Sequence, residues 1–411
     1  MSQTITISAK RSFYEKVILS MLSKMDKGTL NVTMPSGELI VLGSGNGITA
    51  NIEVKDSDFF KRCVLYGDIG FGEAYVDGDW STDDITNVIR WFILNIDNAP
   101  TVSGSKVQSL ALNILKIFNK IYHFNRANSV NGSKKNIAEH YDLNNDFFAS
   151  FLDPTMTYSS AIFRDDTISL EQAQIEKYDR LCRQLNLKPV DHVLEIGSGW
   201  GGNAIHIARN YGCKVTTATI SEEQYKLAVQ RVSSAGLSDR INVILQDYRL
   251  LEGQFDKIVS IEMLEAVGDK FLDVYFKKCH DLLKRDGILA FQVITCPDSR
   301  YESLRNGVDW IQKHIFPGSL LPSVAAINKA INNTSDLTMV DLKDIGLHYA
   351  KTLKMWREKF NSELDRVKQL GFDDRFIRKW NYYLSYCEAA FEMRNINVMQ
   401  MVYARPNNTN R

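Results

Sequence analysis

The sequence has little of several features that would identify a class of protein at once. Positive and negative charges balance, with Lys+Arg 49 and Asp+Glu 49, so net charge gives no sign of a nucleic-acid partner and we expect none. The six cysteines form no Cys-x-x-Cys pair, and no His-rich spacing accompanies them. We therefore expect no metal site and reduced thiols in an intracellular protein.

Long apolar runs are also missing. No stretch reaches the roughly 18 apolar residues that a membrane-spanning helix needs. The N-terminus carries Lys10, Arg11, Glu15 and Lys16 and has no apolar core like that of a signal peptide. We therefore expect a cytoplasmic protein that meets a membrane only at its surface.

Acidic residues are absent between Asp97 and Glu139, where six residues are basic. Apolar residues recur there at steps of three and four, which predicts a basic amphipathic helix over 106–124 and then a polar linker over 127–136. Such a helix suits docking on anionic lipid headgroups. The same apolar stripe is equally typical of a buried face or a dimer seam, and the sequence leaves both open.

A chain of 411 residues is long enough for two or three units of ~150 residues. Short alternating segments at Leu39–Leu42 and Ile48–Val54 predict hairpins, and a helix is expected over Asp56–Tyr66. We divide the chain into a smaller N-terminal α+β domain, the basic helix with its linker, and a larger domain: 1–98, 99–136 and 137–411.

The larger domain alternates short apolar runs with helical patterns. Strands are expected at 192–196, 214–219, 241–245, 257–261 and 287–294, and helices at 204–209, 222–232 and 271–282. This alternation predicts an α/β fold with a parallel sheet and crossover helices. Two late strands and two helices complete the prediction, at 337–342, 398–403, 349–370 and 374–393.

The strongest motif is an apolar strand that runs from Val193 into a glycine-rich turn ending at Gly202 and opening a helix. Glycines let the backbone approach a ligand closely, and a helix N-terminus favours a polar or anionic group. A dinucleotide fingerprint would need a third glycine at the right offset and a carboxylate after the next strand. That strand ends in Thr219-Ile220-Ser221, so a nicotinamide cofactor is disfavoured.

Two further strand ends fall at the same carboxyl edge, where open α/β sheets bind ligands. After the third strand, Asp247 is placed to accept from an adenine amino group, with Tyr248 beside the ring. After the fourth, Glu262 and Glu265 would share one face if the segment were helical. The alternative for either glutamate is a charge at a helix N-terminus that complements the helix dipole.

Short motifs follow one another in order over about residues 137–406. In chain order they are His140–Leu143, Asn145–Phe148, Leu152–Pro154, Tyr158–Ser159, the turn ending Gly-Trp-Gly-Gly, Thr-Ile-Ser, Gln-Asp-Tyr-Arg, Glu-x-Val-Gly, Ile315–Gly318 and Leu321–Ser323. Together they resemble the cyclopropane-fatty-acid synthase family. The resemblance implies a Rossmann-like class I methyltransferase sheet, mostly parallel with one antiparallel strand, and dependence on S-adenosylmethionine (SAM).

The resemblance also implies the site residues, position by position. Those expected around SAM are Tyr141, Tyr158, Ser159, Gly197, Gly199, Thr219, Ile220, Gln224, Gln246, Asp247, Tyr248 and Glu262. Family members also hold a bicarbonate, and the matching catalytic positions here are Glu265, Tyr349, Ile294, Ser160 and Gln292. Ser160 stands where the family has cysteine, and Gln292 where it has histidine. Both side chains can donate to an anion but are neutral, and we expect them to bias the product.

The expected function is SAM-dependent methyl transfer to double bonds of phospholipid acyl chains, by a homodimer on the inner membrane face. A carbocation would then lose a proton to bicarbonate or an equivalent base, giving cyclopropane, methylene or methyl-branched chains. Related plant alkaloid N-methyltransferases share the framework, so methylation of a small amine is an alternative, and a non-catalytic lipid- or SAM-binding protein is another. The N-terminal domain is expected to present lipid or to dimerise.

Overall fold

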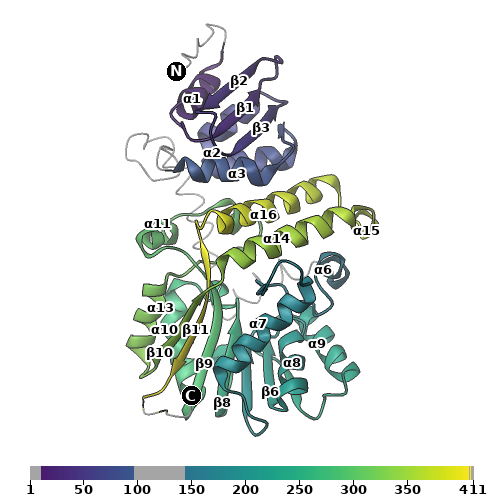
Figure 1. The fold of residues 1–411 in the computed structure, drawn as a ribbon, viewed down its shortest axis with the longest axis vertical. Coiled ribbons are helices and arrows are strands. Elements are labelled where there is room, and N and C mark those ends of the chain that lie inside the picture. Colours follow the sequence, from purple (N-terminus) through teal and green to yellow (C-terminus); the bar gives the residue numbers. More distant parts are fainter. Residues whose placement is uncertain (1–10, 97–143, 407, 409–411) are drawn as a thin grey trace.

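The computed structural model describes residues 11–96, 144–406 and 408. These residues form a small sheet near the N-terminus and a large sheet in the rest of the chain (Figure 1). The predicted basic helix over 106–124, its linker and Tyr141 lie outside the described residues. Within the part of the chain that is described, no helix has the length and apolar character to cross a bilayer.

The N-terminal sheet has the strand order β2-β1-β3-β4. The elements of this unit are α1 Phe13–Leu22, β1 Thr29–Thr33, β2 Leu39–Gly43, β3 Thr49–Val54, α2 Asp58–Asp77, β4 Trp80–Ser81 and α3 Ile85–Leu94. Every second residue of β2 and of β3 is buried, as expected of strands that cover a core with one face.

The segments predicted at Leu39–Leu42 and Ile48–Val54 are present as β2 and β3, and β2 forms a hairpin with β1. The hairpin prediction for β3 was wrong. β3 pairs in parallel with β1 instead of forming a second hairpin. Gly43, Gly45 and Gly47 have positive φ, a backbone conformation open to glycine. They let the connection pass the start of β1, where Thr29 N donates to Ile48 O (2.8 Å).

The large sheet has the order β10-β11-β9-β8-β5-β6-β7. Its strands are β5 His192–Ile196, β6 Lys214–Thr219, β7 Ile241–Leu245, β8 Phe255–Ile261, β9 Leu283–Thr295, β10 Thr338–Asp344 and β11 Asn397–Ala404. Of these described strands, β11 alone runs in the opposite direction to all the others. The expected mostly parallel sheet with one antiparallel strand is therefore confirmed.

Helices cover both faces of the large sheet (Figure 1). They are α7 Leu170–Leu185, α8 Gly202–Tyr211, α9 Glu222–Ser234, α10 Leu272–Leu282 and α13 Val324–Thr334. Leu181 of α7 and Ile207 of α8 belong to one buried cluster. Phe276 of α10 and Ile331 of α13 belong to another. Apolar cover on both sides is what a parallel sheet requires.

The remaining helices lie beyond the carboxyl edge or in connections. They are α6 Asn145–Phe151, α11 Tyr301–Arg305, α12 Trp310–His314, α14 Gly346–Ser362, α15 Leu364–Gln369 and α16 Asp374–Glu392, with the 3-10 turns η2 Tyr248–Leu250, η3 Leu264–Ala266, η4 Asp269–Phe271 and η5 Asp298–Arg300.

Two helices differ from their predicted ranges. The helix predicted over 56–66 continues as α2 to Asp77, past a kink at Gly67 where φ is 58°. The helix predicted over 349–370 is divided into α14 and α15, because Glu363 between them has φ −110° and ψ 18°. The apolar pattern continues across both breaks, so hydrophobic periodicity alone does not reveal them.

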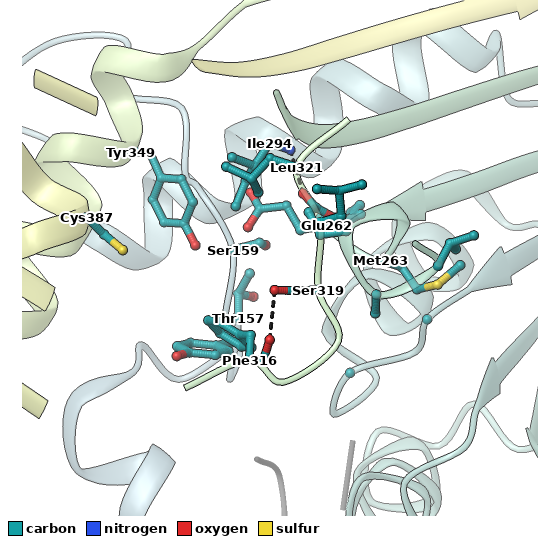
Figure 2. Close-up of a pocket in the computed structure, with 18 of the residues that line it drawn as sticks. Thr157, Ser159, Glu262, Met263, Ile294, Phe316, Ser319, Leu321, Tyr349 and Cys387 are labelled. Carbon is teal, nitrogen blue, oxygen red and sulfur yellow. Dashed lines mark hydrogen bonds between the residues drawn. The ribbon is translucent and has the colours of Figure 1, made fainter. Parts of the chain in front are cut away.

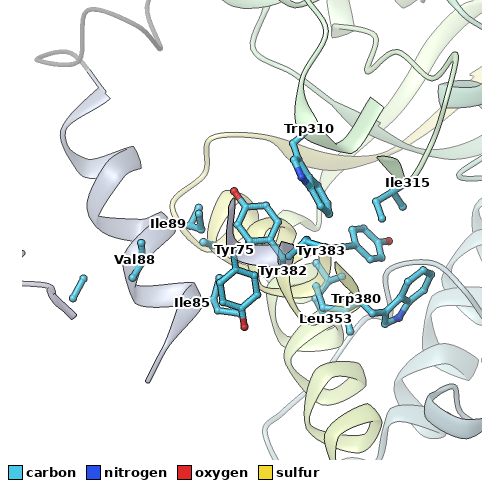
Figure 3. Close-up of a cluster of buried hydrophobic side chains, with 14 of the residues drawn as sticks. Tyr75, Ile85, Val88, Ile89, Trp310, Ile315, Leu353, Trp380, Tyr382 and Tyr383 are labelled. Carbon is cyan, nitrogen blue, oxygen red and sulfur yellow. The ribbon is translucent and has the colours of Figure 1, made fainter. Parts of the chain in front are cut away.

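The N-terminal unit packs on α16 through α2 and α3. Its buried residues belong to the same apolar cluster as those of α14 and α16 (Figure 3). Tyr75 and Trp310 both contact the ring of Tyr382, with centroids 5.7 and 4.6 Å apart. The Arg378 guanidinium lies over the Tyr75 ring at 4.1 Å. The contact between the N-terminal unit and α16 is therefore a packed aromatic core, with the Arg378 guanidinium stacked on one of its rings.

Gly72 shows how closely α2 approaches this core. A Cβ at position 72 would lie 2.5 Å from the Trp310 ring and 2.8 Å from Tyr382. We expect Gly72→Ala to lower the free energy of unfolding by about 1–3 kcal/mol, because both buried rings must shift. Gly307→Ala, whose nearest atom would be 3.3 Å away, is the matched control and should cost less than about 1 kcal/mol. Urea unfolding followed by tryptophan fluorescence measures both, and equal effects would contradict this account.

Candidate active site

A cavity of about 350 Å³ opens at the carboxyl edge of the large sheet. The predicted cofactor residues in the described part of the chain all line it: Tyr158, Ser159, Gly197, Gly199, Thr219, Ile220, Gln224, Gln246, Asp247, Tyr248 and Glu262. The predicted catalytic residues Glu265, Ile294 and Tyr349 line it as well, whereas Ser160 and Gln292 do not.

The turn after β5 is held by its own backbone. Gly197 N and Ser198 N both donate to Ala218 O at the end of β6, each at 2.9 Å. Gly197 and Gly199 have φ of 97° and 47°, and a Cβ on Gly199 would meet no protein atom within 4 Å. Gly199 thus presents bare backbone to the cavity beside the N-terminus of α8. This arrangement suits the polar end of a ligand.

The ends of β6 and β7 contribute polar groups that already have protein partners. Thr219 Oγ1 donates to Gln224 Oε1 (3.0 Å). The Asp247 carboxylate accepts from Arg249 N (2.9 Å) and is bound by the Arg249 guanidinium, with Nη2 at 2.6 Å from Oδ2. The expected contact of Asp247 with an adenine amino group would use a lone pair that Arg249 leaves open, and it stays a prediction.

Glu262 follows β8, and its placement differs from the predicted shared helical face. Its backbone has φ of 47° and precedes η3, so it is not helical. Glu262 Oε1 accepts from Ser160 N (2.9 Å) and Gln292 Nε2 (2.7 Å). The Tyr349 side chain also bonds this carboxylate. Because these partners come from other elements, Glu262 does not act as a helix N-terminal charge.

Glu265 lies on η3 and turns toward β9. Its Oε1 accepts from Ile294 N (2.5 Å). Its Oε2 is buried and has no hydrogen-bond partner among the described residues. Burial, together with the nearby charge of Glu262, raises the pKa of Glu265 to about 8. A carboxylate oxygen with a raised proton affinity is therefore open to whatever occupies the cavity.

Ser159 is hydrogen-bonded to a buried lysine, Lys177, that the sequence analysis missed. Ser159 Oγ accepts from Lys177 Nζ (2.7 Å), and Lys177 is fully buried on α7. Burial lowers the pKa of Lys177 to about 8, against the opposing charge of Glu262. Its spacing in the sequence could have revealed its burial, because Lys177 lies four residues from both Ala173 and Leu181, which are buried on the same helix face.

Ser160 and Gln292 stand one layer behind the cavity wall. They are 0% and 1% exposed. Ser160 Oγ donates to Ala161 O (3.1 Å), while Gln292 Nε2 donates to Glu262 and to Ser160 O (3.1 Å). A buried neutral donor needs a partner, and here the partners are protein groups. Neither side chain therefore directs a donor into the cavity in this arrangement, and the expected effect of both residues on the product stays a prediction.

The rest of the wall is mostly apolar, with a few polar residues such as Arg300, Asp309 and Asn395, and one cavity joins it to the glycine turn and to both glutamates. Figure 2 shows Glu262, Phe316 and Leu321 among the residues that line this cavity. Aromatic residues that line it are Phe316, Tyr383, Tyr386 and Phe391, whereas others are packed in the core: Trp310, Trp356, Phe360, Trp380 and Tyr382. Sequence analysis missed the aliphatic lining residues Ile311, Leu320, Leu321, Leu353 and Ile396. Single aliphatic residues on helices or in connections carry no pattern that could have revealed them as cavity residues.

The sheet order and the glycine turn define a class I methyltransferase fold. The solved mycolic acid cyclopropane synthase CmaA1, complexed with SAH and CTAB, aligns with a TM-score of 0.61 and 29% identity, over 66% of this chain and 98% of that one. Residues 128–401 match the family described as mycolic acid cyclopropane synthetase. The chain belongs to this family.

Two relatives extend the likeness over most of the chain. The tuberculostearic acid methyltransferase UfaA1 of Mycobacterium tuberculosis (strain ATCC 25618 / H37Rv) is 40% identical over 84% of this chain and 81% of its own length. The cyclopropane-fatty-acyl-phospholipid synthase of Escherichia coli (strain K12) is 39% identical over 87% of this chain and 88% of its own. The family predicted from the motifs is thus confirmed.

The raised pKa of Glu265 predicts a pH dependence of stability. Between the ordinary pKa of 4.5 and the folded value of about 8, the folded protein keeps a proton that the unfolded chain has released. The contribution of Glu265 to the free energy of unfolding is therefore largest below pH 4.5, decreases as the pH rises, and stops changing near pH 8. Glu265→Gln removes the titration, so between pH 5 and 8 the variant should gain about 1.4 kcal/mol per pH unit relative to wild type.

Urea unfolding at a series of pH values measures this difference. Glu302→Gln is the matched control, because that side chain is 71% exposed on α11 and outside the cavity. A Glu265→Gln difference as independent of pH as that of the control would show that Glu265 has no raised pKa.

Proposed function

We propose that the protein transfers the methyl group of SAM to the double bond of an unsaturated acyl chain in a membrane phospholipid, giving a cyclopropane, methylene or methyl-branched chain. Family membership establishes the SAM-dependent methyltransferase class. The names of the two relatives support an acyl acceptor. The observation that carries the proposal is one cavity that joins bare glycine backbone to an apolar wall beside two buried carboxylates.

The residues around the glycine turn fit the polar part of SAM. Gly197 and Gly199 leave backbone open to the ligand, and polar groups at the ends of β6 and β7 line the adjoining wall. When bound, SAM supplies an electrophilic methyl group on a cationic sulfur. Glu262 and Glu265 would place negative charge near that cation and near the positive charge that develops on the acyl chain.

We assign proton acceptance to Glu265 Oε2. Methyl transfer to an alkene leaves a carbocation on the acyl chain. Loss of a proton from the new methyl group closes a cyclopropane, whereas loss from a neighbouring carbon gives a branched alkene. A base with a pKa near the working pH accepts protons efficiently, and the pKa of Glu265 is about 8. Its Oε2 lacks a protein partner among the described residues, which supports this role.

A bicarbonate held at the family positions does not fit this arrangement. The Ile294 N–H is already bound to Glu265 Oε1. Gln292 donates within the protein, and Ser160 does the same. The chain's own carboxylates are therefore the proton acceptors that the site offers.

The apolar wall would exclude water, which would otherwise trap the cation. Phe316, Leu321 and Phe391 contribute to this wall. A phospholipid substrate would bring the protein to the bilayer surface on the cytoplasmic side. The basic segment over 106–124 is the proposed contact with anionic headgroups. We also propose a homodimer, with an N-terminal domain that presents lipid or dimerises.

Binding of SAM tests the cofactor site. Gly199→Asn keeps a residue that tolerates positive φ and places its side chain where a Cβ meets no protein atom. We expect the Kd for SAM to rise at least about tenfold, because the side chain would occupy ligand space. Gly236→Asn is the matched control, since Gly236 also has positive φ and open space but lies outside the cavity. Calorimetry measures both, and an unchanged Kd for Gly199→Asn would exclude this placement of SAM.

Methyl transfer to vesicles tests the function. Purified protein with labelled SAM should label phospholipid in dioleoylphosphatidylglycerol vesicles, and mass spectrometry of the acyl chains identifies the product as ring or branch. Glu265→Gln should lower kcat at least about a hundredfold, whereas Glu302→Gln should not. Transfer to soluble amines but not to vesicles would favour an N-methyltransferase. SAM binding without turnover on either acceptor would favour a non-catalytic protein.

A further inference from the structure

Three side chains link the surface to Glu262 by hydrogen bonds. Arg180 of α7 donates through Nη1 to Gln400 Oε1 of β11 (2.5 Å). Gln400 Nε2 donates to Gln292 Oε1 on β9 (2.9 Å), and Gln292 Nε2 donates to Glu262 Oε1 (2.7 Å). Gln400 and Gln292 are directly opposite in the pairing of β11 with β9, and both are almost fully buried. We call Arg180, Gln400 and Gln292 the amide relay.

The chemistry of its two ends fixes the direction of every bond in the amide relay. An arginine can only donate, so Gln400 must turn its oxygen to Arg180 and its NH₂ group to Gln292. Gln292 therefore accepts from Gln400 and directs its own NH₂ group to Glu262. The other end requires the same orientation, because the backbone Ser160 O can only accept and is bound by Gln292 Nε2 (3.1 Å).

Arg180 is anchored where it can keep its charge. Its Nη2 donates to Asp341 Oδ2 of β10 at 2.8 Å, and the two side chains are 18% and 29% exposed. Contact with water and a carboxylate partner both favour the charged guanidinium. The amide relay therefore begins at a donor whose direction does not change with pH.

We propose that Arg180 and Gln400 are positioning residues, which orient Gln292 so that it donates to Glu262 and holds Glu262 as the ionised member of the glutamate pair. This inference rests on the proposed methyl transfer. A donor stabilises the ionised form of a carboxylate, and a fixed negative charge beside Glu265 makes Glu265 the stronger base. Two carboxylates in unlike surroundings can thus divide charge stabilisation from proton acceptance.

Other groups also face Glu262. Burial raises the pKa of Glu262, whereas the charge of Lys177 from α7 and the Tyr349 side chain from α14 lower it. Glu265 from η3 also faces it, and the charge of Glu262 helps to raise the pKa of Glu265. Lys177 titrates itself, with a pKa lowered by burial to about 8. The amides of the relay do not titrate, so their donation to Glu262 persists when Lys177 loses its proton.

Gln400→Glu reverses the amide relay with little change in volume. A carboxylate at position 400 still binds Arg180 but has no donor for Gln292. Gln292 must then turn its NH₂ group to position 400 and its oxygen to Glu262, which can meet an oxygen only when protonated. In the proposed mechanism both carboxylates act in the ionised form, Glu262 as a fixed charge and Glu265 as the base. We therefore expect the acid limb of the pH profile of kcat, measured with SAM and dioleoylphosphatidylglycerol vesicles, to move up by at least about one pH unit, because Glu262 now ionises last. KM should change less than about twofold, because no residue that lines the cavity is altered.

Two further variants complete the comparison. Arg180→Met removes the first donor and should shift the acid limb in the same direction by a smaller amount; it also carries the test if Gln400→Glu does not fold. Arg183→Met is the matched control on the same helix, where the arginine is 55% exposed and binds Glu176. It should leave the pH profile and kcat unchanged.

An infrared titration separates this inference from the proposed function. The carboxyl band that disappears in Glu262→Gln reports ionisation of Glu262 without turnover, and in Gln400→Glu it should titrate at a higher pH than in wild type. If wild type methylates no vesicle lipid, the proposed function fails, and the band still decides the orientation of the amide relay. Coincident band titrations, or coincident pH profiles in an active enzyme, would overturn the amide relay.

Discussion

Two carboxylates share the wall of one buried cavity, and much of the surrounding structure offsets the cost of placing them there. A buried charge is unfavourable unless it is paired and hydrogen-bonded. Glu262 receives two N–H donors, from Ser160 and Gln292, whereas Glu265 receives a single one from Ile294. The pair is therefore asymmetric in its hydrogen bonding. The oxygen left without a donor in the described structure belongs to Glu265, and this asymmetry is what allows one carboxylate to hold charge while the other accepts a proton.

The parts of the fold that the sequence predicted best are those where local pattern and tertiary burial agree. The strands at 192–196, 214–219 and 241–245 have the predicted ends, because each is a short run with β-branched residues that is bounded by helical or turn patterns. The failures have a different physical origin. The parallel pairing of β3 with β1 depends on a crossing loop with positive φ at its glycines, and pairing direction leaves no trace in alternation.

In the candidate site, too, some residues could be predicted from local sequence and others could not. Residues at the carboxyl ends of strands could be predicted, because topology brings all such ends to one edge. The residues that tune them could not. Lys177 and Arg180 come from a helix that precedes the sheet, and Gln400 comes from the last strand, so nothing local in the sequence joins them. Gln292 was identified only by its position in the family pattern, and its role changed once Gln400 and Glu262 were seen as its partners.

The N-terminal unit contributes no residue to the proposed chemistry, but it contacts an element that forms the cavity. The CmaA1 structure is covered over 98% of its length by 66% of this chain, so the catalytic fold exists in the family without a counterpart of the whole N-terminal unit. In this chain α2 nevertheless packs on α12, and Ile311 of α12 lines the cavity. Against its burial, hydrogen bonds from His314 and Lys313 lower the pKa of Glu73 to about 2. An ionised Glu73 on α2 therefore binds α12, the helix that contributes Ile311 to the cavity wall. A displacement of the N-terminal unit would move this part of the wall, where the acyl chain is proposed to lie.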